Sequence, residues 1–384
     1  MKDTEALPGG DQSALRRLNT SRVLRLLYEG GPLAINAIAR VTGLSRPTAR
    51  GIVAALLEAG TVRSDGLESV PTGGRPAQRY AFDLDAGRLA GVHIDAATVS
   101  VRLTDLGGRH RASRTLPLPA DSAPQARIAV AAELVHELLD DDPAPLWAVG
   151  AGTPGIIDAA GAVRLSVAIP RWSGVRLAEN LGARLGCRVT AMKDTNLAAL
   201  AEHRVGAAQG TADVLYVQIG RRLGVGVLVD GRPFTGRTGA AGEIGRHPGL
   251  GWNDAPARLL AAAGEREDGG AQQAALVLTR ARHGDAAARA AVAAYARALA
   301  AGVGAMVLAM DPRLIVLGGT LPGAGAAVVD DVREHLADIC YDVPPVVLSA
   351  LTDEAVVVGG VEAARDLLRD GLPAPAEGVT AADR

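Results

Sequence analysis

The sequence is poor in cysteine and lacks any secretory segment. Cys187 and Cys340 are its only cysteines, too few for a disulfide framework or a four-thiolate metal site, and their scarcity fits a reducing compartment. The first thirty residues lack the apolar stretch and cleavage site of a signal peptide, and no apolar run is expected to reach membrane-spanning length. We therefore expect a cytoplasmic protein without a metal or a membrane partner.

An excess of charge of one sign is also lacking, but the charges are unevenly distributed. The formal net charge of −2 gives the whole chain no general affinity for nucleic acid. Between Leu15 and Phe82, however, ten arginines stand against four carboxylates, which gives a local charge of +6. The length of 384 residues and the 48% hydrophobic content favour a globular chain of two or three domains. The first of these is predicted to face an anionic partner.

Helices and a hairpin are predicted in the N-terminal region. Apolar spacing and Gly or Pro breaks predict helices over 20–30, 33–43 and 46–59, then short strands over 61–63 and 79–82. Ser45 stands at the N-cap of the third helix, and Pro47 lies in its first turn. This order is typical of a winged helix-turn-helix, which we assign to residues 15–84. Residues 1–14 are predicted to be a disordered leader.

Polar side chains gather at the start of the third helix, the part that a helix-turn-helix places against base edges in the major groove. They are Ser45, Arg46, Thr48 and Arg50. Arginine can form a bidentate pair with guanine, and the free N–H groups of a helix start can hold a phosphate. We predict that Arg46 and Arg50 read the base sequence.

The loop between the two short strands offers a second DNA contact. In Gly73-Gly74-Arg75-Pro76, Arg75 can enter a minor groove because Gly74 lets the backbone approach. Taken singly, such arginines are more often solvated side chains, and such glycines only form a turn. The whole arrangement, with its local charge, predicts binding to double-stranded operator DNA.

From Ala90 onward, strand-like and helical segments alternate. Strands are predicted over 91–105, 147–152, 213–220, 223–229, 314–317 and 346–351, and helices over 127–139, 196–206, 286–310 and 361–369. This alternation predicts an α/β fold. Residues 371–384, rich in Ala, Pro and acidic residues, are predicted to be a flexible tail.

Seven short motifs make the chain similar to the ROK family, named for repressors, open reading frames and kinases. They are Leu18-Asn19-Thr20-Ser21-Arg22, Gly43-Leu44-Ser45, Gly73-Gly74-Arg75-Pro76, Thr153-Pro154-Gly155, Asp194-Thr195-Asn196, Gly242-Glu243-Ile244-Gly245, and Asp311-Pro312 through Leu317-Gly318-Gly319. The resemblance implies an actin-like (sugar kinase/ATPase-like) two-lobed domain over 88–370, with a sugar between the lobes and, in kinase members, ATP beside it. The implied small lobe is about 88–195 plus the C-terminal helix, and the large lobe is about 196–355.

Both phosphate-binding hairpins depart from those of the family kinases. The first, Gly-hydrophobic-Asp-hydrophobic-Gly-Gly-Thr, corresponds here to Gly-Val-His-Ile-Asp-Ala-Ala over 91–97. Its acid, later glycines and threonine are absent, and Asp95 would place a carboxylate where phosphate oxygens should lie. In the second, Arg221 and Arg222 replace a Thr and a Gly that permit close backbone approach. We therefore predict no ATP cofactor and no kinase activity.

Two acids of the family's sugar pocket are retained. Asp194 matches the general base of family kinases, and Glu243 matches a hydroxyl-binding acid. Around them, Ala168 and Lys193 replace asparagines, and Arg246 replaces a histidine. We predict that Asp194, Glu243, Lys193 and Arg246 bind a small-molecule effector.

Two interpretations of this pocket stay open. In one, Asp194 caps the helix starting near Asn196 or pairs with Lys193. Glu243 is then held by Arg246, and the pocket is filled by its own ion pair. In the other, Lys193 and Arg246 recognise an anionic ligand such as a sugar phosphate or a sugar acid.

No metal is predicted downstream of Glu243. Residues 248–260 contain no cysteine, so the zinc motif that the resemblance would place there is missing. A lone histidine, His247, is more often a surface or core residue than a ligand.

Three functions are weighed. The favoured one is a DNA-binding transcription regulator, a repressor of sugar uptake or catabolism, in which a small sugar-like effector controls a homodimer or homotetramer. The second is an active ATP-dependent sugar kinase with a DNA-binding appendage, which sugar-dependent ATP turnover would reveal. The third is a ligand-independent DNA-binding dimer, whose operator affinity no metabolite alters.

Overall fold

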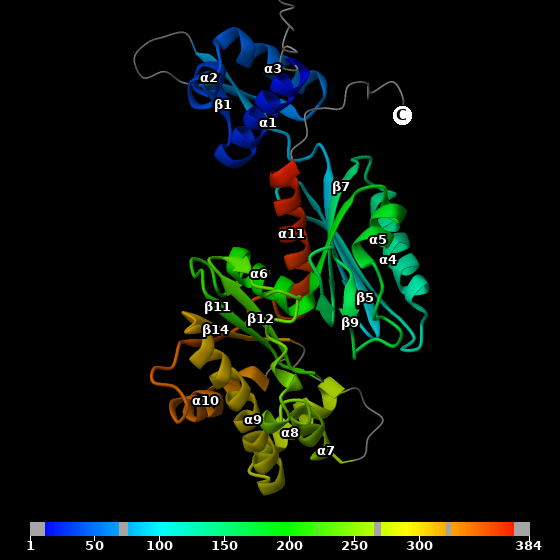
Figure 1. The fold of residues 1–384 in the computed structure, drawn as a ribbon, viewed down its shortest axis with the longest axis vertical. Helices are drawn as coiled ribbons and strands as arrows, with labels where there is room; N and C mark the ends of the chain where they lie inside the picture. The colour runs from blue at the N-terminus through cyan, green and yellow to red at the C-terminus, as the bar shows by residue number, and fades with distance from the viewer. Residues whose placement is uncertain (1–11, 69–75, 221, 265–269, 320–323, 372–384) are drawn as a thin grey trace, which may run out of the picture. The chain divides into compact units, whose positions relative to one another are not determined.

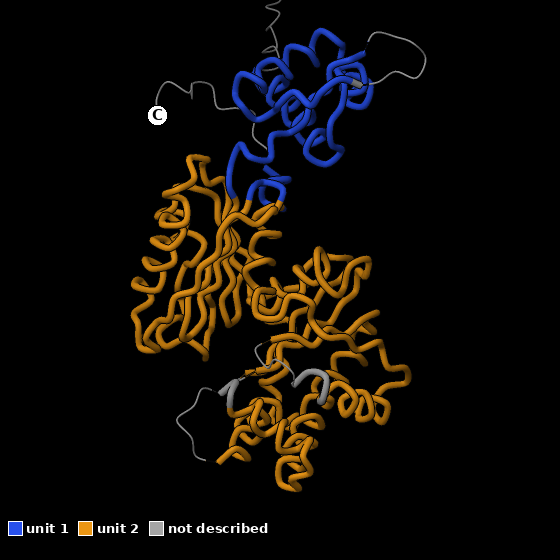
Figure 2. The backbone as a smooth tube through the Cα atoms, turned by 180° about the vertical axis from the view of Figure 1, so that it is seen from behind, with its two compact units in different colours: residues 1–88, 105–107, 366–384 blue, residues 89–104, 108–365 orange. Residues whose placement is uncertain are grey.

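The computed structural model describes residues 12–68, 76–220, 222–264, 270–319 and 324–371. The chain divides into two compact units (Figure 2). Unit 1 comprises residues 1–88, 105–107 and 366–384, and unit 2 comprises residues 89–104 and 108–365. Residues 1–11 of the predicted leader and residues 372–384 of the predicted tail lie outside the described residues. The two free cysteines, Cys187 and Cys340, are both half-buried.

Over its described N-terminal residues, unit 1 contains three helices and a small antiparallel sheet (Figure 1). The elements are α1 (Gln12–Gly30), β1 (Leu33–Ala34), α2 (Ile35–Thr42), α3 (Arg46–Glu58), β2 (Val62–Glu68) and β3 (Ala77–Phe82), with the sheet order β1-β3-β2. Val23, Leu27, Ile38, Leu56 and Phe82 are buried in its core. The predicted order of helices followed by a hairpin is confirmed.

Two boundaries in unit 1 differ from the sequence prediction. Helix α1 begins at Gln12, so 12–14 do not belong to a leader, and the Ser13 hydroxyl accepts a hydrogen bond from Arg17 at 2.7 Å one turn later. Residues 33–34 are not helical. Leu33 pairs with Tyr80 of β3, because a partner strand from later in the chain satisfies its backbone groups.

The first sheet of unit 2 has five strands in the order β10-β7-β4-β5-β6. These are β4 (Arg88–Ile94), β5 (Thr98–Asp105), β6 (His110–Pro117), β7 (Leu146–Thr153) and β10 (Arg188–Lys193). Helices α4 (Pro124–Leu139) and α5 (Leu177–Leu185) cover one face, where Val92 and Ile94 pack with Ile128 and Leu181. A separate two-stranded sheet joins β8 (Ile156–Ile157) to β9 (Val163–Leu165).

The second sheet of unit 2 has the order β13-β12-β11-β14-β15. The strands are β11 (Val214–Gln218), β12 (Gly224–Val229), β13 (Arg232–Pro233), β14 (Leu314–Gly318) and β15 (Val346–Leu348). One face packs on α7 (Ala255–Ala261), α8 (Gly270–Arg282), α9 (Ala286–Met310) and α10 (Ala324–Ala337). The other face packs on α6 (Asp194–Val205) and on α11 (Ala355–Gly371).

Helix α9 corrects one expectation from the sequence. Over the described residues it is the one helix long and apolar enough to cross a membrane, so the expectation that no apolar run reaches that length is wrong. More than half of its most apolar window is buried, and Tyr295, Leu299 and Val303 lie in the core beneath the second sheet. A core helix passes the same test, because packing against a sheet selects the same apolar residues as a membrane does.

Candidate functional site

The start of α3 presents a polar, basic surface. The Ser45 hydroxyl caps the helix by accepting a hydrogen bond from the Thr48 N–H at 3.2 Å. Arg46, Thr48 and Arg50 are exposed, whereas Ala49, Ile52, Val53 and Leu56 of the same helix are buried. The helix therefore packs through one face and leaves the four predicted DNA contacts free to meet a duplex.

The predicted wing contacts Gly74 and Arg75 lie outside the described residues. On either side of them, β2 and β3 pair as antiparallel strands, with Glu68 opposite Ala77. The role of Gly74 and Arg75 stays a prediction.

A second candidate site lies where three strands of the first sheet end. Strands β10 and β7 are parallel, with Lys193 opposite Thr153, so Asp194 follows directly at this edge. The Thr153 hydroxyl donates to the Ile94 carbonyl at 2.9 Å and accepts from the indole N–H of the buried Trp172 at 2.9 Å. In open α/β sheets, ligands bind at such carboxyl edges.

The Asp194 carboxyl is the buried acid of this edge. It is 7% exposed, stands at the first position of α6, and accepts the Thr195 N–H at 2.7 Å. Desolvation by burial raises the pKa of Asp194, and His93, the Thr195 N–H and Lys193 oppose that rise. Lys193 stands at the N-cap position of α6 and no side chain caps the helix there, so Asp194 bonds only the next N–H. A ligand contact by the Asp194 carboxyl stays a prediction.

Lys193 and Glu243 form an ion pair at this site. The Lys193 ammonium donates to Glu243 Oε1 at 3.1 Å and to the Ala241 carbonyl at 2.9 Å, with its side chain only 5% exposed. The expectation that Arg246 holds Glu243 is wrong. The lysine reaches Glu243 from the end of β10, whereas Arg246 is exposed at the end of the 3₁₀ helix η1 (Ile244–Arg246).

His93 belongs to this site although the sequence interpretation did not select it. It lies near the end of β4, and an electrostatic interaction with it opposes the rise in the pKa of Asp194. Its Nε2 atom is buried without a hydrogen-bond partner among the described residues. The sequence did offer a signal for His93, because it stands in the first hairpin at the position where family kinases have an aspartate.

The turn that follows His93 is held by its own chain. The Asp95 N–H donates to the Thr98 carbonyl at 2.9 Å, and the Leu118 N–H donates to Ala97 at 2.7 Å. Arg127, fully buried, donates to the Asp95 carbonyl at 3.0 Å and to three further carbonyls of residues 119–122. Sequence reasoning missed Arg127, because a buried arginine bonded to carbonyls has no local signature.

The second altered hairpin also contacts this region. Arg222 donates to the carbonyls of Val167 and Ala168, both at 3.4 Å, and Ala168 packs against the core of the first sheet. Arg221 lies outside the described residues. Two positions that differ from the family pattern, 168 and 222, therefore meet in space.

Zinc does not fit the segment after Glu243. His247 Nδ1 accepts the Gly249 N–H at 3.2 Å, which uses that nitrogen within its own turn. No cluster of three or more His, Cys, Asp or Glu side chains suited to a metal occurs in the described part of the chain.

Comparison with known families identifies both parts of the chain. The ROK family model matches residues 89–366, and the IclR helix-turn-helix domain model matches residues 18–66. The chain belongs to the ROK family. Its ROK domain thus has the actin-like, sugar-kinase-like fold, and a helix-turn-helix domain precedes it.

Relatives of the ROK domain include both regulators and kinases. The xylose repressor of Bacillus subtilis is 24% identical, over 61% of this chain and 61% of its own length. The glucokinase of Thermotoga maritima is 28% identical, over 71% of this chain and 95% of its own length. The matched region thus spans about three fifths of the xylose repressor.

A solved structure extends the likeness of fold to nearly the whole chain. A ROK family transcriptional regulator, described as a homologue of the Escherichia coli Mlc protein, superposes with a TM-score of 0.72 at 20% identity. It covers 93% of this chain and 98% of its own. The helix-turn-helix and the ROK domain therefore occur together in one known architecture.

Proposed function

We propose that this protein is a DNA-binding transcription regulator, a repressor of sugar uptake or catabolism, controlled by a small sugar-like effector. The observation that carries the proposal is one chain that joins an exposed arginine-bearing helix to a ROK domain with altered phosphate hairpins. The names of the relatives support it, since they include a xylose repressor and a transcriptional regulator. We further propose that it acts in the cytoplasm as a homodimer or homotetramer, because paired helix-turn-helix domains match palindromic operators.

In this proposal the start of α3 reads the operator. Arg46 and Arg50 are exposed at the helix start, and the local charge of +6 attracts the phosphate backbone. Ser45 orders the first turn by accepting the Thr48 N–H, and the hydroxyls of Ser45 and Thr48, both exposed residues, bond each other at 2.8 Å. Gly74 and Arg75 are proposed as minor-groove contacts on the basis of the sequence alone.

The effector is proposed to be a neutral sugar held at the carboxyl edge of the first sheet. Asp194, Glu243 and His93 supply acceptors and a donor for hydroxyl groups, as sugar pockets require. The Lys193 charge is neutralised by Glu243, so it does not favour a phosphate or a sugar acid. Arg246 is exposed, so we propose that it contacts a ligand only at the solvent-facing edge of the site.

The ROK domain is proposed to be inactive as a kinase. The first hairpin carries His93 in place of the acid, and internal hydrogen bonds together with Arg127 hold the turn after it. In the second hairpin, the retained Gly226 has a packing role, since a Cβ atom there would lie 2.0 Å from the Thr195 carbonyl oxygen. The altered residues of both hairpins support the proposal that the domain does not hold phosphates and magnesium.

One observation favours the second candidate, an active sugar kinase. Asp194 is retained at the general-base position, and its raised pKa is a property that catalytic bases share. An ADP-release assay with purified chain, ATP, magnesium and each common hexose tests this directly. We expect no sugar-dependent ADP above the level given by Asp194→Asn. Turnover that the substitution abolishes would establish the kinase instead.

The regulator proposal is tested by selection of genomic DNA fragments by the full chain, followed by titration of the bound fragment with sugars. We expect one selected sequence family with inverted half-sites and at least one sugar that changes its affinity. No selected sequence would refute DNA reading. Selection that no sugar alters would leave the ligand-independent DNA-binding dimer as the better description.

A further inference from the structure

Helix α6 carries a buried carboxylate at the end opposite Asp194. Glu202 is 0% exposed, and its Oε2 atom accepts the Ala207 N–H at 2.7 Å and the Ala350 N–H at 3.3 Å. Its Oε1 atom accepts the Leu351 N–H at 3.1 Å and the Ser349 hydroxyl. A buried carboxylate with four donors is fixed in position, because moving it would leave a charge without partners.

The segment held by Glu202 leads directly into α11. The Ser349 hydroxyl also accepts the Thr352 N–H at 2.8 Å, and Thr352 opens the 3₁₀ helix η3 (Thr352–Glu354) that precedes Ala355. Thr352 has φ +50°, a left-handed conformation that is costly for a β-branched residue. The network around Glu202 therefore maintains a strained turn at the start of α11.

Helices α6 and α11 also meet backbone against backbone. A Cβ atom on Gly359 of α11 would lie 1.9 Å from the Leu197 carbonyl oxygen of α6. Helix α11 approaches β7 in the same way, since a Cβ atom on Gly150 would lie 2.0 Å from the Gly360 carbonyl oxygen. Such approach leaves no room for side chains, so α11 can move only together with its neighbours or by breaking these contacts. A shift of α6 is thus passed to the start of α11.

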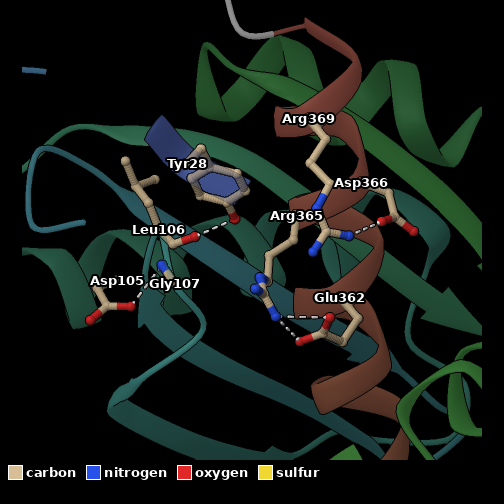
Figure 3. Close-up of polar contacts among 8 residues, drawn as sticks. All are labelled: Tyr28, Asp105, Leu106, Gly107, Glu362, Arg365, Asp366 and Arg369. Atoms are coloured by element: carbon tan, nitrogen blue, oxygen red, sulfur yellow. Dashed lines mark hydrogen bonds and ion pairs between the residues drawn. The ribbon is translucent and has the colours of Figure 1, made fainter. Parts of the chain in front are cut away.

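The same helix continues into unit 1, which contains its residues from Asp366 onward. There the Arg369 carbonyl accepts from Arg25 of α1 at 2.7 Å. In the same unit, the Tyr28 hydroxyl donates to the Leu106 carbonyl at 2.8 Å (Figure 3). Along α11, Arg369 pairs with Asp366, and Arg365 pairs with Glu362 through both carboxylate oxygens. These pairs brace the helix over the stretch that enters unit 1.

We propose that Glu202 is a positioning residue for the regulatory response: through Ser349 and α11, it couples the effector end of α6 to the helix-turn-helix. This inference rests on the proposed function. Coupling between two binding sites is reciprocal, so the effector should alter the helix-turn-helix and the operator should alter the effector site. Operator binding in unit 1 should therefore alter α6 itself, even without a sugar.

The test is hydrogen exchange of the full chain with and without the operator duplex that it selects. In the unaltered chain, we expect operator to change exchange in the α6 peptide by about twofold or more. In Ser349→Ala, which removes the hydroxyl link, this change should fall by at least about half while operator affinity stays within about threefold. Ser349→Thr, which retains a hydroxyl, should restore the response.

Controls separate coupling from general loosening. Thr279→Ala removes an exposed hydroxyl that bonds the Ala275 carbonyl within α8, and it should leave the α6 response unchanged. Glu202→Gln should reduce the response further, and where it fails to fold, Ser349→Ala carries the test. Operator binding without any change in α6, or a full response in Ser349→Ala, would overturn the proposal. Absence of operator binding would refute the proposed function itself.

Discussion

At the scale of single residues, the chemistry of Asp194 depends on where the fold places it. Burial raises its pKa, so the folded state holds the proton more tightly than the unfolded chain does. The stability that Asp194 contributes is present below the ordinary carboxyl pKa and is lost as pH rises through the raised one. At neutral pH the buried Asp194 carboxyl lowers the stability of the fold. An acid that is retained despite this loss of stability is more typical of a binding site than of a core.

Asp194→Asn should therefore stabilise the protein at neutral pH. The amide can still accept the Thr195 N–H, and it has no charge to desolvate. Urea unfolding at several pH values from about 4 to 8 should show a gain that is largest at the alkaline end and vanishes toward the ordinary carboxyl pKa. A gain independent of pH would contradict the assignment of the cost to the buried charge.

Asp285 provides a control of opposite sign. It caps α9 by accepting the Ala288 N–H at 3.0 Å, and this hydrogen bond lowers its pKa. Its contribution to stability is present above the ordinary carboxyl pKa and is lost as pH falls through the lowered one. Asp285→Ala should thus destabilise the protein at neutral pH, with an effect that fades in acid.

Arg46 and Arg50 carry the residue-scale prediction for DNA. Arg46→Ala or Arg50→Ala should weaken specific operator binding by about 1–3 kcal/mol, because each would remove a bidentate base contact that we predict. Arg184→Ala, at an exposed helix position of α5, is the control. Fluorescence anisotropy with the selected duplex measures all three. Losses no larger than that of Arg184→Ala would count against α3 as the reading helix.

At the scale of elements, two helical glycines separate the effect of helix packing from that of intrinsic helix propensity. A Cβ atom on Gly359 would meet the Leu197 carbonyl, so α11 approaches α6 only because this position has no side chain. Gly51 of α3, in contrast, has nothing within 4 Å of its Cβ position. The same substitution should therefore have opposite effects on the two helices.

Gly359→Ala should lower the free energy of unfolding by about 1–3 kcal/mol, since two backbones must separate. Gly51→Ala should raise it by about 0.5–1 kcal/mol, because alanine is the better helix former. Urea unfolding followed by circular dichroism compares the two variants with the unaltered chain. A neutral result for Gly359→Ala would show that α11 is not locked to α6.

At the scale of the whole molecule, ligand and operator should be linked. A sugar that changes operator affinity by a given factor must have its own affinity changed by the same factor when operator is bound, about 5–150-fold for ordinary coupling. Calorimetric titration of the sugar into free and operator-bound protein measures this. Asp194→Asn should keep normal operator affinity and lose most of the sugar response. An unaltered response would place the ligand elsewhere.

Much of the fold could be predicted from the sequence, because local rules decide it. Ser45, Pro47 and the glycines at 43 and 60 set the bounds of α3, and alternating apolar patterns indicated the α/β domain. The strand at residues 33–34 was not predicted, since it forms only by pairing with residues 79–80 of β3. The expectation about the length of apolar runs failed at α9, because burial in the tertiary structure decides whether an apolar helix belongs to a core.

The sequence by itself determined the order of the two domains, the arginine-bearing helix start and the altered residues of both hairpins, since each is a property of adjacent residues. Only the tertiary structure decided that Lys193 rather than Arg246 pairs with Glu243, and that Glu202 holds the segment before α11. These contacts join residues that are about 50 to 150 positions apart. No local pattern selects such partners, because the packing of sheets and helices brings them together.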